Sequence, residues 1–451
     1  MRKLIAVFIL ISSVVHSQSY TFNPYSSRGV GELDPSYHGA FGGLGQVTSV
    51  FSDSTQLNFY NASSYSFLGK GQPIFSIGLS ARSVELQEAN FKSAKTLLGI
   101  NDFSLGMSFG KRFGFAFGIK PYSSTGYESK WFASESNTKD TVYKDTVYYT
   151  ASGYGSVNQS FIGISSFLIN KNGHTLSVGG QFNYLFGQLF NKRSNTLNNA
   201  FNGGLLLNSL KVNGVNFDAG ITYKYEISKK HILTLASNYT FSTRLKYERS
   251  EVTAIATDVT DQLQYDTLTS DLTSGNFYNP SIFTAGFKYD FFNFNNVNTT
   301  SNRVYHIQLL ADIKITQWNS TVTSLPSSGL NPSNVVSFHT GVQFTPHYDV
   351  LDRSKTVSLI SKIKYRVGGF YSSTPWVSNN SKIYTNYALT FGLGIPVLAQ
   401  RSLSSLNISY VLGTRTTSST NELVERYGAF QFGVVICPSF YDRWFKKGKI
   451  D

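Results

Sequence analysis

The stretch Phe113-Gly114-Phe115-Ala116-Phe117-Gly118-Ile119 places a large apolar side chain at every second position and a very small one between. This period of two matches an extended strand, whose successive side chains point to opposite faces. The same alternation returns at 387–395 and 430–436. A soluble sandwich would put polar side chains opposite the apolar ones. Here that face is often Gly, Ala or Ser, which favours a strand whose bulky face contacts lipid.

The composition fits a closed membrane barrel better than soluble domains. Only 14% of the 451 residues are charged, against about 25% in soluble proteins, whereas 15% are aromatic. No segment after the first residues approaches the ~18 uncharged apolar residues of a membrane helix. A barrel with an apolar outer face and a polar lumen reconciles these features. We therefore predict an all-β fold, a transmembrane antiparallel barrel.

The chain begins like an exported protein. Arg2 and Lys3 precede an apolar run over 4–15, and Val15-His16-Ser17 offers a cleavage site. This run is too short for a transmembrane anchor. We expect residues 1–17 to be a signal peptide. We expect the mature chain to be a multi-pass barrel in the cell outer membrane. The residue directly after the cleavage site is Gln18 and not a cysteine, so we expect no lipoprotein anchor.

About fourteen strands can be assigned from the alternation, each long enough for the ~9–11 residues of a tilted membrane strand. They lie near 73–85, 101–110, 112–124, 157–169, 173–187, 209–227, 231–247, 280–292, 303–318, 333–347, 356–372, 384–396, 402–413 and 426–437. We assign 71–438 to the barrel and 439–451 to a basic periplasmic tail.

The connections alternate between short and long. Short turns are expected at 110–112, 170–173, 228–230, 349–355 and 399–401, and long polar loops near 124–156, 188–208, 248–279, 319–332, 373–383 and 414–425. Outer-membrane barrels have short periplasmic turns and longer outer loops. With an even number of strands, both termini are then expected in the periplasm.

Residues 18–70 do not alternate and are rich in glycine. A barrel of about fourteen strands is wider than its wall side chains can fill. This segment is therefore expected to lie in the lumen as a plug or hatch, the alternative being a loose periplasmic leader. The residues singled out are Gly29, Gly31, Gly42, Gly43, Gly45, Asn58, Asn61 and Ala62.

Three parts of this segment, 23–33, 42–45 and 58–65, resemble the N-terminus of FadL/TodX-type outer-membrane transporters, most closely the FadL-like barrels of Bacteroidota. The stretches 113–123 and 442–447 also resemble those proteins. The resemblance implies a fourteen-stranded barrel with an N-terminal hatch that carries hydrophobic molecules inward. The family usually has Asn-Pro-Ala where this chain has Asn61-Ala62-Ser63, so this turn lacks the constraint of a proline.

If the large apolar residues face lipid, their neighbours on each strand face the lumen. The polar residues placed there are Asp218, Lys224, Lys288, Asp290, His306, Asp312, Lys314, Lys362, Lys364 and Arg366. One interpretation is a polar pathway with a cationic side that attracts anions. The other, favoured because acids and bases lie on nearby strands, is that opposite charges brace the wall.

Other classes of function find little support. The histidines are scattered and form no metal motif, and no Gly-x-Ser-x-Gly or phosphate-binding loop is present. We expect neither an enzyme nor a cofactor nor a bound metal. The net charge of +13 is not clustered, so a nucleic-acid partner is not expected. Cys437 is the single cysteine and can form no intrachain disulfide.

Two functions remain open. The first is passive diffusion of small hydrophobic or amphipathic molecules, of the long-chain fatty-acid type, past an N-terminal hatch. Its partners would be outer-membrane lipids and a small hydrophobic ligand. The second is a non-transporting accessory barrel that docks on another outer-membrane assembly, such as the type IX secretion translocon. An apolar pocket in the barrel mouth would favour the first, and a solidly filled lumen the second.

The inside–outside assignment can be tested directly. Phe115→Arg and Leu389→Arg should each destabilise the barrel by about 2–4 kcal/mol if they lie near the bilayer midplane. Denaturant unfolding in lipid would measure this change. Unaltered assembly and stability of both variants would show that the two faces have been exchanged.

Overall fold

The computed structural model describes residues 20–33, 37–70, 73–88, 91–134, 146–197, 203–256, 265–294, 304–318, 333–347, 358–377, 383–397, 403–416 and 423–438. The predicted signal peptide and the whole of the predicted basic tail lie outside these ranges. No helix among the described residues is long and apolar enough to cross a membrane.

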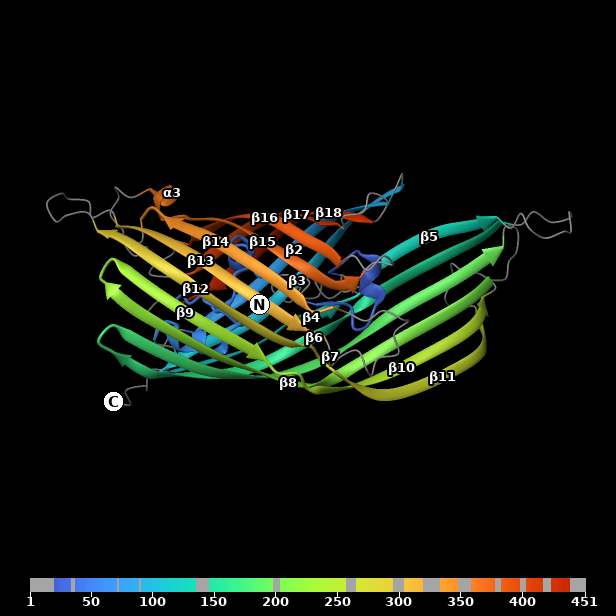
Figure 1. Cartoon of the computed structure of the whole chain (residues 1–451), viewed down its shortest axis with the longest axis horizontal. Coiled ribbons are helices and arrows are strands. Elements are labelled where there is room, and N and C mark those ends of the chain that lie inside the picture. The colour runs from blue at the N-terminus through green and yellow to red at the C-terminus, as the bar shows by residue number, and fades with distance from the viewer. Residues whose placement is uncertain are drawn as a thin grey trace, which may run out of the picture.

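The fold is a closed antiparallel barrel of fourteen strands, as predicted (Figure 1). Eight of them are single segments of ordinary or moderate length: β2 (Ile74–Glu88), β3 (Phe91–Phe109), β13 (Val304–Gln317), β14 (Val335–Thr345), β15 (Lys364–Val377), β16 (Ile383–Pro396), β17 (Ser405–Thr416) and β18 (Val424–Ile436). Pairing of β18 with β2 closes the ring.

The other six strands are longer or interrupted. They are β4 (Phe113–Ser124) continued by β5 (Tyr127–Ser134), β6 (Thr146–Lys171), β7 (His174–Leu197), β8 (Gly203–Ser228), β9 (His231–Thr240) continued by β10 (Arg244–Ala256), and β11 (Tyr265–Tyr278) continued by β12 (Ser281–Phe294). Each interrupted pair counts as one strand, because β6 pairs with both β4 and β5, and β8 with both β9 and β10.

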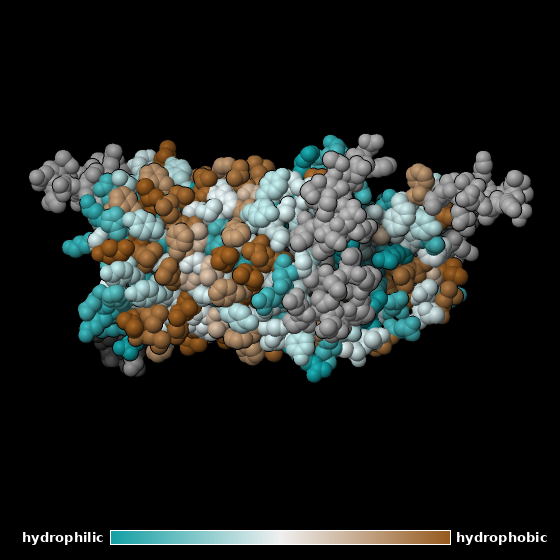
Figure 2. Space-filling model, in the orientation of Figure 1, coloured by the Kyte–Doolittle hydropathy of each residue, from teal (hydrophilic) through white to brown (hydrophobic). Residues whose placement is uncertain are grey.

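The predicted alternation is confirmed. Along β16, Leu389 is 62% exposed, whereas its neighbour Thr390 is fully buried. Phe117 is likewise exposed on β4, and Ala116 is buried. Figure 2 shows apolar side chains spread over the outer face of the barrel. The large residues therefore form the outer surface and the small ones line the lumen.

Three of the predicted long loops are largely strand, which is a correction. The regions 124–156, 188–208 and 248–279 contain β5, β10, β11 and the outer halves of β6, β7 and β8. Together these segments form an open sheet, here called the extension, that projects beyond the rest of the barrel (Figure 1). A strand that projects beyond a bilayer need not alternate between apolar and small residues, which explains why the pattern of a membrane strand did not reveal these segments.

The short turns at 110–112, 170–173 and 228–230 are as predicted. Asn172 and Gly173 both have positive φ, 54° and 79°, as a tight two-residue hairpin turn requires. The predicted turns at 349–355 and 399–401 lie outside the described residues.

The strand predicted over 356–372 begins later. Residues Leu359–Lys362 form a helical turn, α3, because the Ser358 side chain accepts a hydrogen bond from the Ile360 amide and caps it. Lys362 consequently lies on α3, where it is buried, and not on a strand facing the lumen.

The described residues 20–33 and 37–70, here called the N-terminal segment, lie inside the barrel (Figure 1). Their short elements are η1 (Pro24–Ser27), β1 (Glu32–Leu33), α2 (Gly39–Gly42) and η2 (Ala62–Phe67). β1 pairs with the end of β4, α2 contacts β16, β17 and β18, and η2 contacts β3, β4, β6, β7 and β8. The segment therefore touches opposite sides of the wall.

Candidate functional site

The N-terminal segment approaches the wall at positions where the wall carries glycine. A Cβ added to Gly368 would lie 2.4 Å from the Gly45 nitrogen, and one added to Gly341 would lie 2.6 Å from the Leu44 oxygen. Gly392 faces Gly43 in the same way, at 2.9 Å from its Cα. These contacts are backbone against backbone, so even alanine in the wall would force the segment to move.

On the opposite wall, η2 makes equally close contacts. A Cβ on Gly114 would lie 2.1 Å from the Tyr65 carbonyl carbon, and one on Gly179 would lie 2.5 Å from that of Ala62. The small residues that separate the large ones in the sequence therefore make room for the N-terminal segment.

Two of the predicted hatch residues shape the segment itself. The Asn58 amide group donates to the carbonyls of Thr48 and Phe51, at 2.6 and 2.9 Å. Asn61 caps η2 by accepting from the Ser63 amide at 3.1 Å and donates to the Ser49 carbonyl at 2.7 Å. The cap forms with Ala62, where the family usually has proline.

The predicted glycines have distinct positions. Gly29, Gly31 and Gly45 have positive φ values of 58°, 88° and 64°, which side chains disfavour. Gly42 faces the Gln431 side chain of β18, and Gly43 faces Gly392. All five therefore lie at turns or close contacts of the N-terminal segment.

Asp312 on β13 fixes the middle of the N-terminal segment. Its carboxylate accepts hydrogen bonds from the amides of Thr48 and Ser49, at 2.7 and 2.8 Å, and from the Ser49 hydroxyl at 2.5 Å. A buried carboxylate left without donors would be costly. Its three donors all come from the segment, so Asp312 depends on the segment being in place.

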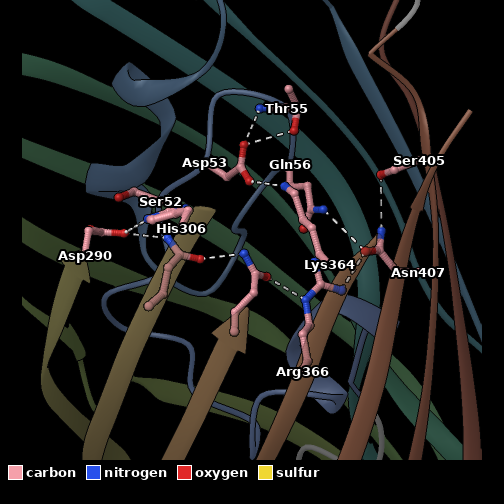
Figure 3. Close-up of polar contacts among 12 residues, drawn as sticks. Ser52, Asp53, Thr55, Gln56, Asp290, His306, Lys364, Arg366, Ser405 and Asn407 are labelled. Atoms are coloured by element: carbon pink, nitrogen blue, oxygen red, sulfur yellow. Dashed lines mark hydrogen bonds and ion pairs between the residues drawn. The ribbon is translucent and has the colours of Figure 1, made fainter. Parts of the chain in front are cut away.

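A continuous row of polar side chains, here called the polar belt, runs along the inner face of strands β12 to β17 (Figure 3). Asp290 on β12 contacts Lys288 at 3.3 Å and His306 at 2.9 Å, and accepts from Gln308 at 2.6 Å. Gln308 in turn accepts from Gln343 on β14, at 2.6 Å.

The belt continues through Arg366 on β15, whose side chain is fully buried. Arg366 donates to Gln343 at 2.8 Å and to Asn407 on β17 at 2.7 Å, and Gln56 of the N-terminal segment also donates to Asn407. Lys364 binds Asp53 of the segment at 2.9 Å. Burial alone would raise the pKa of Asp53, but Lys364 and the hydrogen bonds from Thr55 hold it below its usual value.

The structure brings some of the predicted lumen residues together and separates others. Lys288, Asp290, His306, Lys364 and Arg366 belong to the belt, whereas Asp312, also on the wall, binds Thr48 and Ser49 of the N-terminal segment.

Apart from Lys362 on α3, three predicted lumen residues lie elsewhere. Asp218 accepts from Asn183 at 2.8 Å, and Lys224 pairs with Glu226 of its own strand at 3.0 Å. Lys314 lines the cavity described next. The expected pairing across adjacent strands occurs between His306 and Asp290. Several other charges instead bind the N-terminal segment, which the sequence analysis did not foresee.

A cavity of about 190 Å³ lies in the mouth of the barrel, on the side of the N-terminal segment away from the short turns. Its aromatic lining comes from both the segment and the wall: Tyr20, Tyr25, Tyr37, Trp318, Phe370, Tyr384 and Tyr427. Leu33, Leu97 and Val411 add apolar surface, and Ser80 and Asn386 add polar groups. The cavity can therefore surround a small amphipathic molecule.

A cluster of four charged side chains lies at this cavity: Glu32, Arg82 and Arg415 line it together with the separate cation Lys314, and Glu425 contacts both arginines. Glu425 binds Arg82 at 2.8 Å and Arg415 at 3.0 Å, and Arg415 binds Glu32 of the N-terminal segment at 2.6 Å. Burial alone would raise the pKa of Glu32, but the two arginines lower it to about 2. Two acids thus balance two bases. This cluster was not predicted from the sequence, because its members lie on three distant segments of the chain.

The described residues contain no group of three or more His, Cys, Asp or Glu side chains placed to hold a metal ion. Cys437 is buried and has no disulfide partner.

Comparison with solved structures identifies similar barrels. A FadL homologue of Pseudomonas aeruginosa has a TM-score of 0.55 and 12% identity, over 91% of this chain and 99% of that one. The toluene transporter TodX of P. putida has a TM-score of 0.54 and 14% identity, over 91% and 99%. The toluene transporter TbuX of Ralstonia pickettii has a TM-score of 0.52 and 12% identity, over 89% and 98%. The FadL/TodX-type fold inferred from the sequence is confirmed.

A sequence model of the BamG family matches residues 1–451 of this chain. The search of curated proteins found no match to this chain.

The glycine contacts predict how the N-terminal segment can be displaced. Gly179→Val should loosen η2, since the new side chain would overlap the backbone at Ala62 and Ser63. Limited proteolysis of the folded barrel should then cut the segment at least several-fold faster. Gly180→Val is the matched control, because a Cβ there meets only the Asp218 oxygen, at 3.9 Å. Equal protection in both variants would contradict this account of the packing.

Proposed function

The chain belongs to the BamG family, and from that starting point we propose that it is an outer-membrane channel for small hydrophobic or amphipathic molecules. A molecule would enter the aromatic cavity at the barrel mouth and diffuse passively past the N-terminal segment, which serves as a hatch. Residues 1–17 are proposed to be a signal peptide, and both termini to lie in the periplasm. The barrel's lasting partners would be the outer-membrane lipids around its apolar belt.

The cavity is the observation that carries this proposal. It combines seven aromatic side chains with a balanced set of buried charges, at the end of the barrel opposite the short turns. Short turns face the periplasm in barrels of this class, so the cavity would face the outside, where cargo is captured. The solved barrels of similar fold include toluene transporters, which supports a hydrophobic cargo.

Passage beyond the cavity requires the hatch to move. Below the cavity the N-terminal segment contacts opposite walls through close backbone contacts, and Asp312 and the polar belt bind it. We propose that cargo passes when part of this segment shifts, and that residues 18–70 form the moving unit. Long-chain fatty acids are the cargo to test first.

A second candidate function is an accessory barrel that docks on another outer-membrane assembly, such as the type IX secretion translocon. The filled lumen below the cavity favours it, and so does the extension, which adds surface outside the membrane belt. Under this proposal the N-terminal segment braces the barrel and does not open.

Liposome uptake of a labelled long-chain fatty acid separates the two candidates. We would compare the full-length chain with one that lacks residues 18–70, each verified as folded by its resistance to SDS. Uptake that depends on the segment supports the channel. No uptake by either form would favour the accessory barrel.

A point variant tests the cavity itself. Ala429→Trp should lower uptake at least fivefold, because Ala429 lines the cavity and the indole would fill it. Val434→Trp, on the lipid-facing side of the same strand and 41% exposed, is the matched control and should leave uptake unchanged. Equal uptake by both variants would remove the cavity from the transport path.

A further inference from the structure

The extension ends in a strand whose outer edge is open. Strand β11 pairs with β10 along its length, and no other described strand pairs with it. Every residue from Asp266 to Ser274 is exposed. Figure 1 shows β11 as the outermost strand of the extension. The backbone N–H and C=O groups along this edge are therefore available to a further strand.

In natural sheets, lysine, proline or a covering loop usually prevents such an edge from pairing with another chain. Strand β11 contains no Lys, Arg or Pro, and Leu272 is 77% exposed. The opposite edge of the extension, β5, does carry such a residue, since Lys130 pairs with Glu128 at 3.1 Å. Among the described residues the two edges of the sheet thus differ, since β11 carries two acids but no basic residue.

The charges along β11 indicate what would bind there. Asp271 lies opposite Glu251 of β10, so two carboxylates share one face of the sheet. Arg249 neutralises only one of them, through its 2.8 Å contact with Glu251. Like charges directly opposite one another are destabilising, and a base on an added strand would relieve this pair.

A β-bulge places a second acid on the same face. Thr253 pairs with Thr269, but Ile255 pairs with Asp266, because the register shifts between Thr253 and Ala254. Asp266 therefore shares the face of Asp271, at a spacing equal to four residues of β10. A strand without a bulge would match both acids with bases four positions apart.

We propose that the edge of β11 is a docking site for an extended, basic segment of a partner polypeptide, which adds to the extension as its next strand. The edge of a second copy is not the occupant, because β11 against β11 would bring acid to acid and β5 has its lysine already paired. This docking does not depend on whether the barrel transports.

The experiment uses the folded full-length chain and a labelled nine-residue probe of alternating threonine and valine, with lysine at positions 2 and 6. Fluorescence anisotropy should show at least tenfold tighter binding than for the same peptide with glutamate at both positions. Asp266→Lys combined with Asp271→Lys should reverse this preference. Equal binding of both peptides, or no binding of either, would overturn the proposal.

Proline variants test the backbone contribution. N–H groups of successive residues in a strand point to opposite edges. One of Thr269→Pro and Ser270→Pro therefore leaves the hydrogen bonds to β10 intact and should reduce lysine-peptide binding at least tenfold. Lys130→Pro on the β5 edge is the control and should have no effect. Binding unaffected by either β11 proline would contradict strand addition.

Fatty-acid uptake by the Asp266→Lys, Asp271→Lys variant tests whether docking at β11 is independent of transport. Uptake should equal that of the unmodified chain, since β11 lies outside the cavity lining. The SDS-resistance assay verifies that the variant is folded, and a folded variant should have gained binding of the glutamate peptide. Lost uptake in a folded variant would overturn the claim that docking and transport are independent.

Discussion

Close contact between the backbone of the N-terminal segment and the barrel wall is the constraint on which the rest of the lumen depends. Gly341, Gly368 and Gly392 on three adjacent strands admit residues 43–45, and Gly114 and Gly179 admit η2 on the other side. Interiors pack densely, and a gap or an overlap of one methyl group has a measurable cost. The small residues of the wall are therefore matched to this one segment, and they give it a defined position.

The close contact between the N-terminal segment and the wall also provides partners for charges that are buried in the lumen. Asp312 obtains three hydrogen bonds from Thr48 and Ser49, and Lys364 obtains its counter-charge from Asp53. A buried ion whose partner is removed costs far more than the pair contributes. Movement of the segment would thus expose or orphan several groups at once, which keeps the closed arrangement stable and makes any opening a concerted event.

The charges at the mouth of the barrel are balanced differently from those of the polar belt below it. Arg82, Glu425, Arg415 and Glu32 neutralise one another beside a cavity lined largely by rings. Such a cavity binds by contact area and a few oriented polar groups, and not by a free charge. The extension adds a different surface again, since its strands continue past the length that a bilayer requires and end in the edge of β11.

The sequence by itself determined the barrel, its fourteen strands and the face that each strand presents to lipid. These follow from a period of two enforced by the bilayer, as at Phe117 and Ala116 or Leu389 and Thr390. The sequence also identified Asn58, Asn61 and the glycines of residues 18–70. Only the tertiary structure decided what those residues contact, because Gly45 meets Gly368 and Asp53 meets Lys364 across more than 300 positions of chain. It likewise decided the extension and α3, where no bilayer imposes a pattern and hydrogen bonds between neighbouring strands, or a single capping serine, set the structure.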